Sequence, residues 1–353
     1  MKRFISALLL IAISITALLS LSSCVETKDE YPSRGKTISY TYFNTASTMM
    51  VYGEVSDEEF DSYVSEAEKL LSYYHKLFDI YYDYSGVNNI RLINQKAGKE
   101  PVKVDPELID FLSYCKELYT LTGGETNVMM GAVLKIWHNY REDADFDPRE
   151  AEVPEIEHLR RAAEHTSIDS LVIDKEAGTV YISDPEASLD VGAIGKGYAT
   201  EKLYQKLVLM GAEHVALNIG GNIRTIGLKP DGEGWLTGLT NPDKSVGGFA
   251  TKMLLDETAC VTSGNYERYY VVDGIRYHHI IDPDTLMPAE YFSSVTILTE
   301  DSALADALST ALFCMSYEEG LALVKSIGVV DVIWIDLEYN LVKTDGVVLA
   351  NDE

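Results

Sequence analysis

The sequence predicts an α+β fold in which amphipathic helices and short strands interleave along the chain. Residues 58–77 and 106–121 carry apolar side chains at helical spacing, which predicts two amphipathic helices. Short apolar runs bounded by Gly, Asp, Asn or Pro predict strands at residues 171–173, 179–182, 214–219, 293–298 and 329–335. We find no internal repeat and no low-complexity block in the sequence.

Composition limits the partners of this chain. It has 353 residues, of which 46% are apolar, enough for a substantial core. Lys and Arg number 29 against 56 Asp and Glu, giving a net charge of −27. Such a surface repels nucleic acid, so we expect no nucleic-acid partner. Any site for a phosphorylated ligand must then be built locally, from a lysine, a helix N-terminus or a cation.

The N-terminal residues indicate export. Basic Lys2 and Arg3 precede an uncharged stretch at residues 4–23, and the stretch ends in Leu-Ser-Ser before Cys24. We interpret residues 1–23 as a lipoprotein signal peptide and Cys24 as a lipidated residue, with an uncleaved membrane anchor as the alternative. Residues 24–35 are then a polar tether and residues 36–353 the folded domain. This predicts an extracytoplasmic protein, lipid-anchored to the cell membrane.

A glycine-rich turn after Asp190 is a candidate phosphate site. Residues 189–198 suggest a short strand, a turn holding Gly192, Gly195 and Gly197, and a helix that continues to about Met210. Glycines permit close backbone approach, and N–H groups beside Lys196 suit a pyrophosphate. The spacing is not that of a Walker A loop. By itself the segment fits ligand binding and an ordinary strand-to-helix turn equally well.

Two further segments combine glycine with small polar residues. Residues 218–222 read Asn-Ile-Gly-Gly-Asn, for which a bulge or hairpin is the preferred interpretation. Thr262, Ser263 and Gly264 precede a tyrosine-rich strand and can form an ordinary turn.

Adjacent histidines end the next predicted strand. Imidazole titrates near neutral pH, so a histidine near a carboxylate is a common general base. On a strand, His279 and Ile281 face one side and His278 the other, so at most one histidine serves as a base. A packed or surface histidine is the alternative for both.

Residues 301–314 predict a helix that is apolar nearly all round and therefore buried. Asp306, Ser309 and Thr310 share one face of it, and a buried carboxylate needs a partner. Oxygen side chains suit Mg²⁺, although Ser309 and Thr310 can instead bond back to their own helix.

The other polar residues suggest no chemistry. The charged residues 141–164 predict a surface loop and a helix that begins near Pro154, with a solvated face. Cys115, Cys260 and Cys314 lack the spacing of a zinc site or a disulfide framework, so we expect small buried apolar residues.

Taken in order, these motifs resemble those of the ApbE-type FAD:protein FMN transferases. The segments that carry the resemblance are residues 190–197, 218–222, 262–264, 279–283 and 305–310, and agreement extends over about residues 40–345. The resemblance implies mixed or antiparallel sheets with packed helices in a two-lobed single unit. It also implies Mg²⁺ as cofactor, FAD as substrate, and an acceptor that is a flavoprotein subunit of a membrane redox complex.

The resemblance further assigns roles to individual residues. His279 is the expected base, and the Ala193 carbonyl and the Asp306, Ser309 and Thr310 side chains are the expected metal ligands. Contacts to FAD are implied for Asn127, Val128, Met129, Asp190, Lys196, Thr262, Ser263, Gly264 and Ile281. Many members have Asp at the position of Asn127, and Met-Gly-Thr where this chain has Ala46, Ser47 and Thr48.

The expected reaction attaches FMN to a threonine or serine of another protein and releases AMP. Two alternatives remain at this point. One is a pyrophosphatase that splits FAD into FMN and AMP, and the other is an FAD-binding lipoprotein without catalytic activity.

Overall fold

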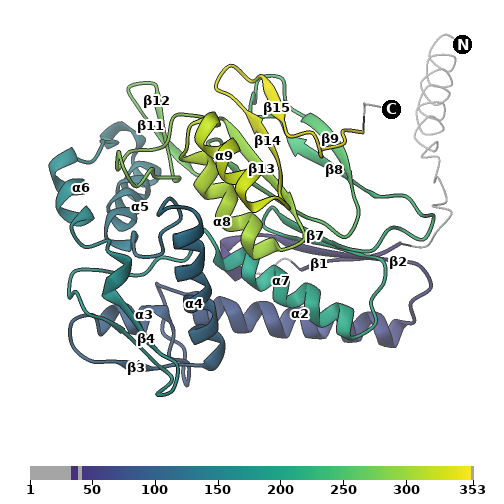
Figure 1. Cartoon of the computed structure of the whole chain (residues 1–353), viewed down its shortest axis with the longest axis horizontal. Helices are drawn as coiled ribbons and strands as arrows, with labels where there is room; N and C mark the ends of the chain where they lie inside the picture. The colour runs from purple at the N-terminus through teal and green to yellow at the C-terminus, as the bar shows by residue number, and fades with distance from the viewer. Residues whose placement is uncertain (1–32, 39–41, 351–353) are drawn as a thin grey trace, which may run out of the picture.

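A large antiparallel sheet organises the right half of the molecule in Figure 1. The computed structural model describes residues 33–38 and 42–350. Every neighbouring pair of strands in this sheet is antiparallel. The order across the sheet is β1 (Ser33–Ile38), β2 (Ser47–Tyr52), β6 (Val215–Ile219), β7 (Asn222–Ile226), β10 (Ala259–Gly264), β13 (Ser294–Thr299), β14 (Asp331–Ile335) and β15 (Leu341–Lys343).

Four helices pack on this sheet or on one another: α2 (Asp57–Phe78), α7 (Gly195–Leu209), α8 (Ser302–Phe313) and α9 (Tyr317–Ile327). α8 lies against β10 and β13, and α7 contacts α8, α2 and β7 (Figure 1). Nearly every residue of α8 is buried, which explains why its sequence is apolar on all sides. The segments around Gly197, Asn222 and Ser263 thereby meet α8 at Asp306 and Ser309.

The left half of the molecule holds a smaller sheet and more helices (Figure 1). Its strands run in the order β3 (Val102–Lys103), β5 (Thr179–Ile182) and β4 (Leu171–Asp174). The helices are α3 (Ile90–Gln95), α4 (Pro106–Leu121), α5 (Gly131–Phe146) and α6 (Ile156–Ala163). One apolar core contains side chains from α2, α4, β4, β5 and α7, so both lobes belong to one folded unit.

Two hairpins extend from the large sheet. The first joins β8 (Trp235–Thr240) to β9 (Phe249–Leu255), and the second joins β11 (Tyr269–Val272) to β12 (Ile275–His278). The second packs on α5, where the rings of Trp137 and Tyr277 stack with centroids 6.0 Å apart. The remaining short turns are the 3₁₀ segments η1 (Tyr42–Asn44), η2 (Pro148–Glu150) and η3 (Ile168–Ser170).

Most predicted elements form with nearly the predicted bounds, and three details differ. Residues 141–146, predicted as loop, complete α5. The strand predicted before the glycine-rich turn is reduced to one bridge between Ser188 and Met130. The last three residues of the predicted tether, 33–35, belong to β1, which pairs with β2.

The predicted signal peptide and Cys24 lie outside the described residues. Within the residues that are described, no helix combines the length and apolarity needed to cross a bilayer.

Candidate active site

The first turn of α7 and the middle of α8 touch through their backbones. A Cβ at Gly197 would collide with the Ser302 carbonyl and with Cβ of Asp306, so only glycine fits there. The Gly197 N–H donates to Oδ2 of Asp306 at 2.8 Å, and Asn222 Nδ2 donates to the same oxygen at 3.1 Å. Lys196 Nζ lies 3.7 Å from the other oxygen, Oδ1. The buried carboxylate therefore has the partners that its burial demands.

Three oxygens around this junction remain available to a cation. Oδ1 of Asp306 has only the long contact with Lys196. Neither the Ala193 carbonyl nor the Thr310 hydroxyl forms a hydrogen bond with any described residue. One carboxylate oxygen, one carbonyl and one hydroxyl are ligands that Mg²⁺ accepts, so these residues fit the ion. The described residues contain no cluster of three or more His, Cys, Asp or Glu suited to a metal, and this predicted set includes only one acid.

Ser309, also predicted as a metal ligand, is already engaged. Its hydroxyl is fully buried, donates to the Asp306 carbonyl at 2.9 Å and lies 2.8 Å from Oγ of Ser263. Thr262, the neighbour of Ser263, shares a hydrogen bond of 2.8 Å with Thr296 across β10 and β13. A serine hydroxyl has one proton and two lone pairs, so these two bonds leave one lone pair of Ser309 for a further contact. Its observed role is to hold α8 against β10 beside Gly264.

The two histidines occupy different environments. Nε2 of His278 contacts the Ala289 carbonyl at 2.9 Å, and its Nδ1 accepts the Ile280 N–H at 3.3 Å. Both ring nitrogens are thus used by the backbone, which requires a neutral ring. Burial lowers the pKa of His278 to about 4. This histidine is part of the core beside Phe313.

His279 follows the end of β12 and faces another direction. Its backbone N–H donates to the Arg268 carbonyl at 3.0 Å, while the ring nitrogen Nδ1 is buried without a partner among the described residues. Ile281, two residues later, packs in the cluster around Trp137, whereas Ile280 packs in the cluster around Phe313. Burial, followed by the positive charges of Arg268 and other nearby groups, lowers the pKa of His279 to about 3. The ring is therefore a neutral imidazole that can accept a proton.

The predicted FAD-contacting segment, residues 127–129, forms a tight turn beside Asp190. Asn127 uses its side chain twice, donating to the Thr166 carbonyl and accepting the Met129 N–H, both at 2.9 Å. Val128 and Met129 are buried, and the Val128 carbonyl accepts the Asp190 N–H at 2.8 Å. Asn127 is therefore committed to the local fold.

Asp190 also reveals charged residues that the sequence analysis overlooked. Burial raises the pKa of its carboxyl, and the nearby charges of His138, Arg268 and Arg141 oppose that rise. Arg141 belongs to the charged stretch that we interpreted as a solvated face. Arg141 departs from that interpretation only in being half-buried, with its Nη2 2.7 Å from Nδ1 of His138. The sequence offered no signal for it, since one arginine among acidic neighbours looks like surface.

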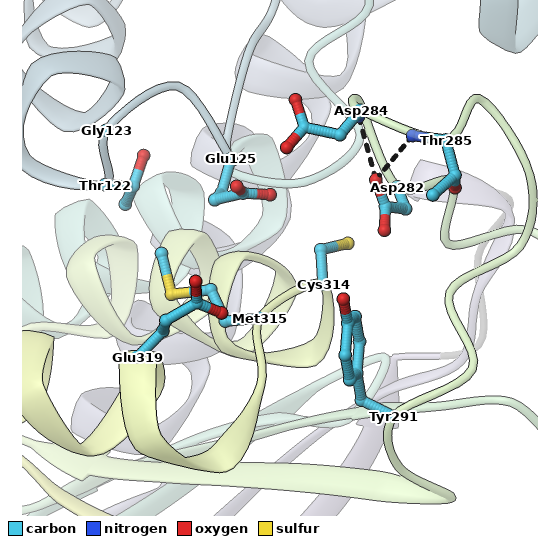
Figure 2. Close-up of a pocket in the computed structure, with 10 residues that line it drawn as sticks. All are labelled: Thr122, Gly123, Glu125, Asp282, Asp284, Thr285, Tyr291, Cys314, Met315 and Glu319. Atoms are coloured by element: carbon cyan, nitrogen blue, oxygen red, sulfur yellow. Dashed lines mark hydrogen bonds between the residues drawn. The ribbon is translucent and has the colours of Figure 1, made fainter.

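A separate pocket of about 450 Å³ lies beside the candidate site (Figure 2). It is bordered by acidic side chains, namely those of Glu125, Asp282, Asp284 and Glu319. Asp282 accepts the N–H groups of Asp284 and Thr285, as the dashed lines in Figure 2 show. Four carboxylates would repel a pyrophosphate, so this pocket does not fit the phosphate-binding part of the site.

Several known proteins are similar to this chain. The model of the ApbE family matches residues 35–334. A Treponema pallidum (strain Nichols) protein named FAD:protein FMN transferase is 34% identical over 259 residues, covering 69% of this chain and 69% of the relative. A Klebsiella pneumoniae (strain 342) protein of the same name is 29% identical over 280 residues, covering 77% of this chain and 83% of the relative.

Solved structures share the fold. The ApbE protein of Thermotoga maritima superposes with a TM-score of 0.76 at 26% identity, covering 90% of this chain and 97% of that one. The flavin transferase ApbE of Vibrio cholerae gives a TM-score of 0.73 at 26% identity, covering 89% and 97%. The predicted α+β fold with mixed or antiparallel sheets and packed helices is confirmed.

Proposed function

The chain belongs to the ApbE family, and on that premise we propose that it is an enzyme that transfers FMN from FAD to a hydroxyl group of another protein. The observation that carries the proposal is the state of His279. Its imidazole is neutral, its Nδ1 lacks a partner among the described residues, and cationic side chains surround it. Burial and these positive charges weaken His279 as a base in the ligand-free chain, and the negative phosphates of bound FAD would offset the positive charges.

In the proposed reaction, a threonine or serine oxygen of the acceptor attacks the FMN phosphorus of FAD. A new P–O bond forms, and the bond from that phosphorus to the bridging oxygen breaks, so AMP leaves with the electron pair. His279 takes the proton of the attacking hydroxyl. General-base assistance of this kind is worth about 10²- to 10⁴-fold in rate.

Lys196 is proposed to hold the pyrophosphate through its ammonium group and its backbone N–H, which suit phosphate oxygens. The neighbouring N–H groups of Gly195 and Gly197 already donate to Val191 and Asp306. Asp190 is proposed to contact the nucleotide from the turn that precedes α7. Asp306, Thr310 and the Ala193 carbonyl would hold Mg²⁺, which supplies Lewis-acid stabilisation of the phosphate charge when bound. Asp306 also orients the first turn of α7 through the Gly197 N–H, whatever ion is present.

The acceptor and the location are proposed from the sequence. We propose that the acceptor is a flavin-bearing subunit of a membrane redox complex, and that Cys24 is lipidated so that the enzyme faces outward. Metabolic labelling with a fatty-acid analogue tests the anchor. Equal incorporation by the Cys24→Ser variant and the parent would contradict it.

The transfer itself is tested by incubating the full chain in detergent with FAD, Mg²⁺ and a candidate acceptor. We expect the intact mass of the acceptor to increase by one FMN group, and an acceptor with valine in place of its threonine to stay unmodified. Release of free FMN and AMP without any labelled acceptor would instead identify a pyrophosphatase. Tight FAD binding with neither product would identify a binding protein.

A further inference from the structure

The β8–β9 hairpin covers one face of the large sheet and shows its other face to solvent. Its inward side chains share an apolar cluster with residues of β6, β10 and β14, namely Trp235, Leu239, Met253 and Leu255 with Ala216, Cys260 and Ile333. Cys260 belongs to this cluster and its neighbour Val261 to the cluster around α8, so the hairpin and α8 lie on opposite faces of the sheet. The hairpin stands at the right of Figure 1, away from the smaller lobe.

The outward face of the hairpin is apolar. Leu236 and Leu254 lie opposite one another in the register and are 61% and 42% exposed. Phe249 is 58% exposed, and its ring lies over Gly238, where a Cβ would collide with it. Leu236, Phe249 and Leu254 thus form one continuous group, which we call the outer patch. Single exposed apolar residues are ordinary on a protein surface, whereas a group of them on one face indicates a binding surface.

The hairpin is poor in acidic residues, although the chain is rich in them. Residues 235–255 contain one acid, Asp243, and two lysines, Lys244 and Lys252, whereas the whole chain has 56 acidic and 29 basic residues. Nζ of Lys252 lies 5.7 Å from the centre of the Phe249 ring. Leucine and phenylalanine side chains flanked by lysine are typical of segments that lie in the water–lipid interface, where the ammonium group reaches the head groups.

The chain enters the fold beside this hairpin. β1 begins at Ser33, which pairs with Tyr52 of β2. The ring of Tyr52 meets that of Trp235, at the start of β8, with centroids 5.2 Å apart. Cys24, which we propose to be lipidated, precedes Ser33 by nine residues, and that length of chain spans at most about 30 Å in any conformation. A lipid on Cys24 therefore keeps the hairpin close to the bilayer.

We propose that the outer patch lies on the lipid bilayer, with its three apolar side chains in the interfacial region. This inference rests on the membrane anchor of the proposed function and adds the orientation of the enzyme to it. The loop at the tip of the hairpin reaches toward the candidate site, because Nζ of Lys244 lies 4.3 Å from the centre of the Tyr266 ring. Tyr266 follows Gly264 by two residues, and Gly264 belongs to a segment predicted to contact FAD. The site is then held near the membrane surface, where an acceptor in a membrane redox complex presents its hydroxyl group.

The test places a tryptophan on the outer patch of the full chain. The protein is inserted into phosphatidylcholine vesicles whose acyl chains carry bromine, which quenches tryptophan fluorescence on close contact. The parent gives the background, because its own tryptophans are buried, namely Trp137, Trp235 and Trp334. Phe249→Trp carries the probe, and Phe146→Trp is the matched control at a side chain of α5 that is 94% exposed. We expect brominated lipid to quench Phe249→Trp severalfold more strongly than Phe146→Trp, because interfacial apolar side chains lie about 5–10 Å deep in the bilayer.

A second substitution tests the patch itself. Leu236→Glu, added to Phe249→Trp, should remove most of the quenching, because a carboxylate opposes burial in the interface. The matched control adds Leu209→Glu, at an exposed leucine that ends α7, and should leave the quenching unchanged. Both leucines are exposed, so neither change removes side-chain packing from the core.

The outcomes separate this inference from the proposed function. Absent quenching of Phe249→Trp, or equal quenching of both probes, overturns the inference. A blue shift of Phe249→Trp emission without quenching by brominated lipid would show that protein, such as a second copy of the chain, covers the patch, and this also overturns it. If the probe is quenched as expected but no acceptor is labelled in detergent, the transfer proposal fails while the membrane surface stands. If acceptor is labelled in detergent and the probe is not quenched, the proposed function stands and this inference fails.

Discussion

The carboxylate of Asp306 accepts the backbone N–H of Gly197 at 2.8 Å, so the helix that carries the candidate metal ligand also caps the helix that carries Lys196. The two residues are 109 positions apart in the chain. Their contact fixes the glycine-rich turn against α8 before any ligand arrives. Pre-formed geometry of this kind lowers the cost of orienting a substrate.

Replacing Asp306 should separate its structural role from its chemical one. Asp306→Ala leaves two buried donors, the Gly197 N–H and the Asn222 amide, without their acceptor. Each such loss costs about 1–3 kcal/mol of unfolding free energy. Asp306→Asn keeps an acceptor oxygen, so it should remain closer to parental stability. Both variants should lose Mg²⁺-dependent FMN transfer, measured from the mass of the acceptor.

Asp306→Asn is the informative control for this pair. If it transfers FMN at the parental rate, Asp306 acts only as a helix cap, and the metal assignment fails. If Asp306→Ala is as stable as the parent in urea unfolding, the capping role fails instead.

A buried ion pair behind the site should govern stability. Arg224 is 2% exposed, its Nε lies 3.3 Å from Glu201 Oε2, and its guanidinium stacks 3.6 Å from the centre of the Tyr204 ring. Arg224→Ala would leave the buried Glu201 carboxylate without its cation, so the unfolding free energy should fall by about 3–5 kcal/mol. The control Arg149→Ala removes an exposed ion pair and should leave urea unfolding unchanged. An equal loss of unfolding free energy in Arg224→Ala and Arg149→Ala would contradict this role of the buried ion pair.

The fold was largely predictable because residues close in the sequence mark where most helices and strands begin and end. Pro106 after Asp105 marks the start of α4, and Gly211 after the apolar run marks the end of α7. The errors arose where contacts between distant segments determine the local structure. The turn before α7 needs no strand because Asp190 bonds to the Val128 carbonyl of another segment, a contact that local sequence does not reveal.

The site was predictable only where residue types limit the chemistry. A carboxylate in an apolar helix demands partners, and Asp306 has them. The hydrogen bond between Ser309 and Ser263 depends on the register between α8 and β10, which the sequence does not specify.

Glu125 should make stability depend on pH. Burial, then the charges of Asp284, Asp282 and Glu319, raises the pKa of Glu125 from 4.5 to about 7. The folded state therefore holds this proton more tightly, so the contribution to stability is present below the unfolded pKa and disappears as pH rises through 7. Glu125→Gln should be more stable than the parent at about pH 8 and nearly equal to it at about pH 4.

Urea unfolding of both proteins across this range measures the difference. The control Glu176→Gln replaces an exposed carboxylate outside the pocket, and its difference from the parent should stay flat with pH. If the difference between Glu125→Gln and the parent also stays constant with pH, neither burial nor the neighbouring acids raise the pKa of Glu125.

The two adjacent histidines should respond to substitution in opposite ways. His278 links the Ala289 carbonyl and the Ile280 N–H and packs its ring on Phe313, so His278→Ala should lower the unfolding free energy by about 2–4 kcal/mol. His279 has no such side-chain bonds, so His279→Ala should fold with nearly parental stability and bind FAD well. Its FMN transfer should nevertheless fall by about 10²- to 10⁴-fold, because a base contributes mainly in the transition state.

Single-turnover transfer at saturating FAD, measured beside urea unfolding, distinguishes these effects. His278→Ala must be assayed at a temperature where it is folded, so that lost structure is not mistaken for lost chemistry. Equal and mild rate losses in the two variants would remove His279 from the mechanism. A severe rate loss confined to folded His278→Ala would instead make His278 the base. The hydrogen bond between its Nε2 and the Ala289 carbonyl would then have to break during turnover.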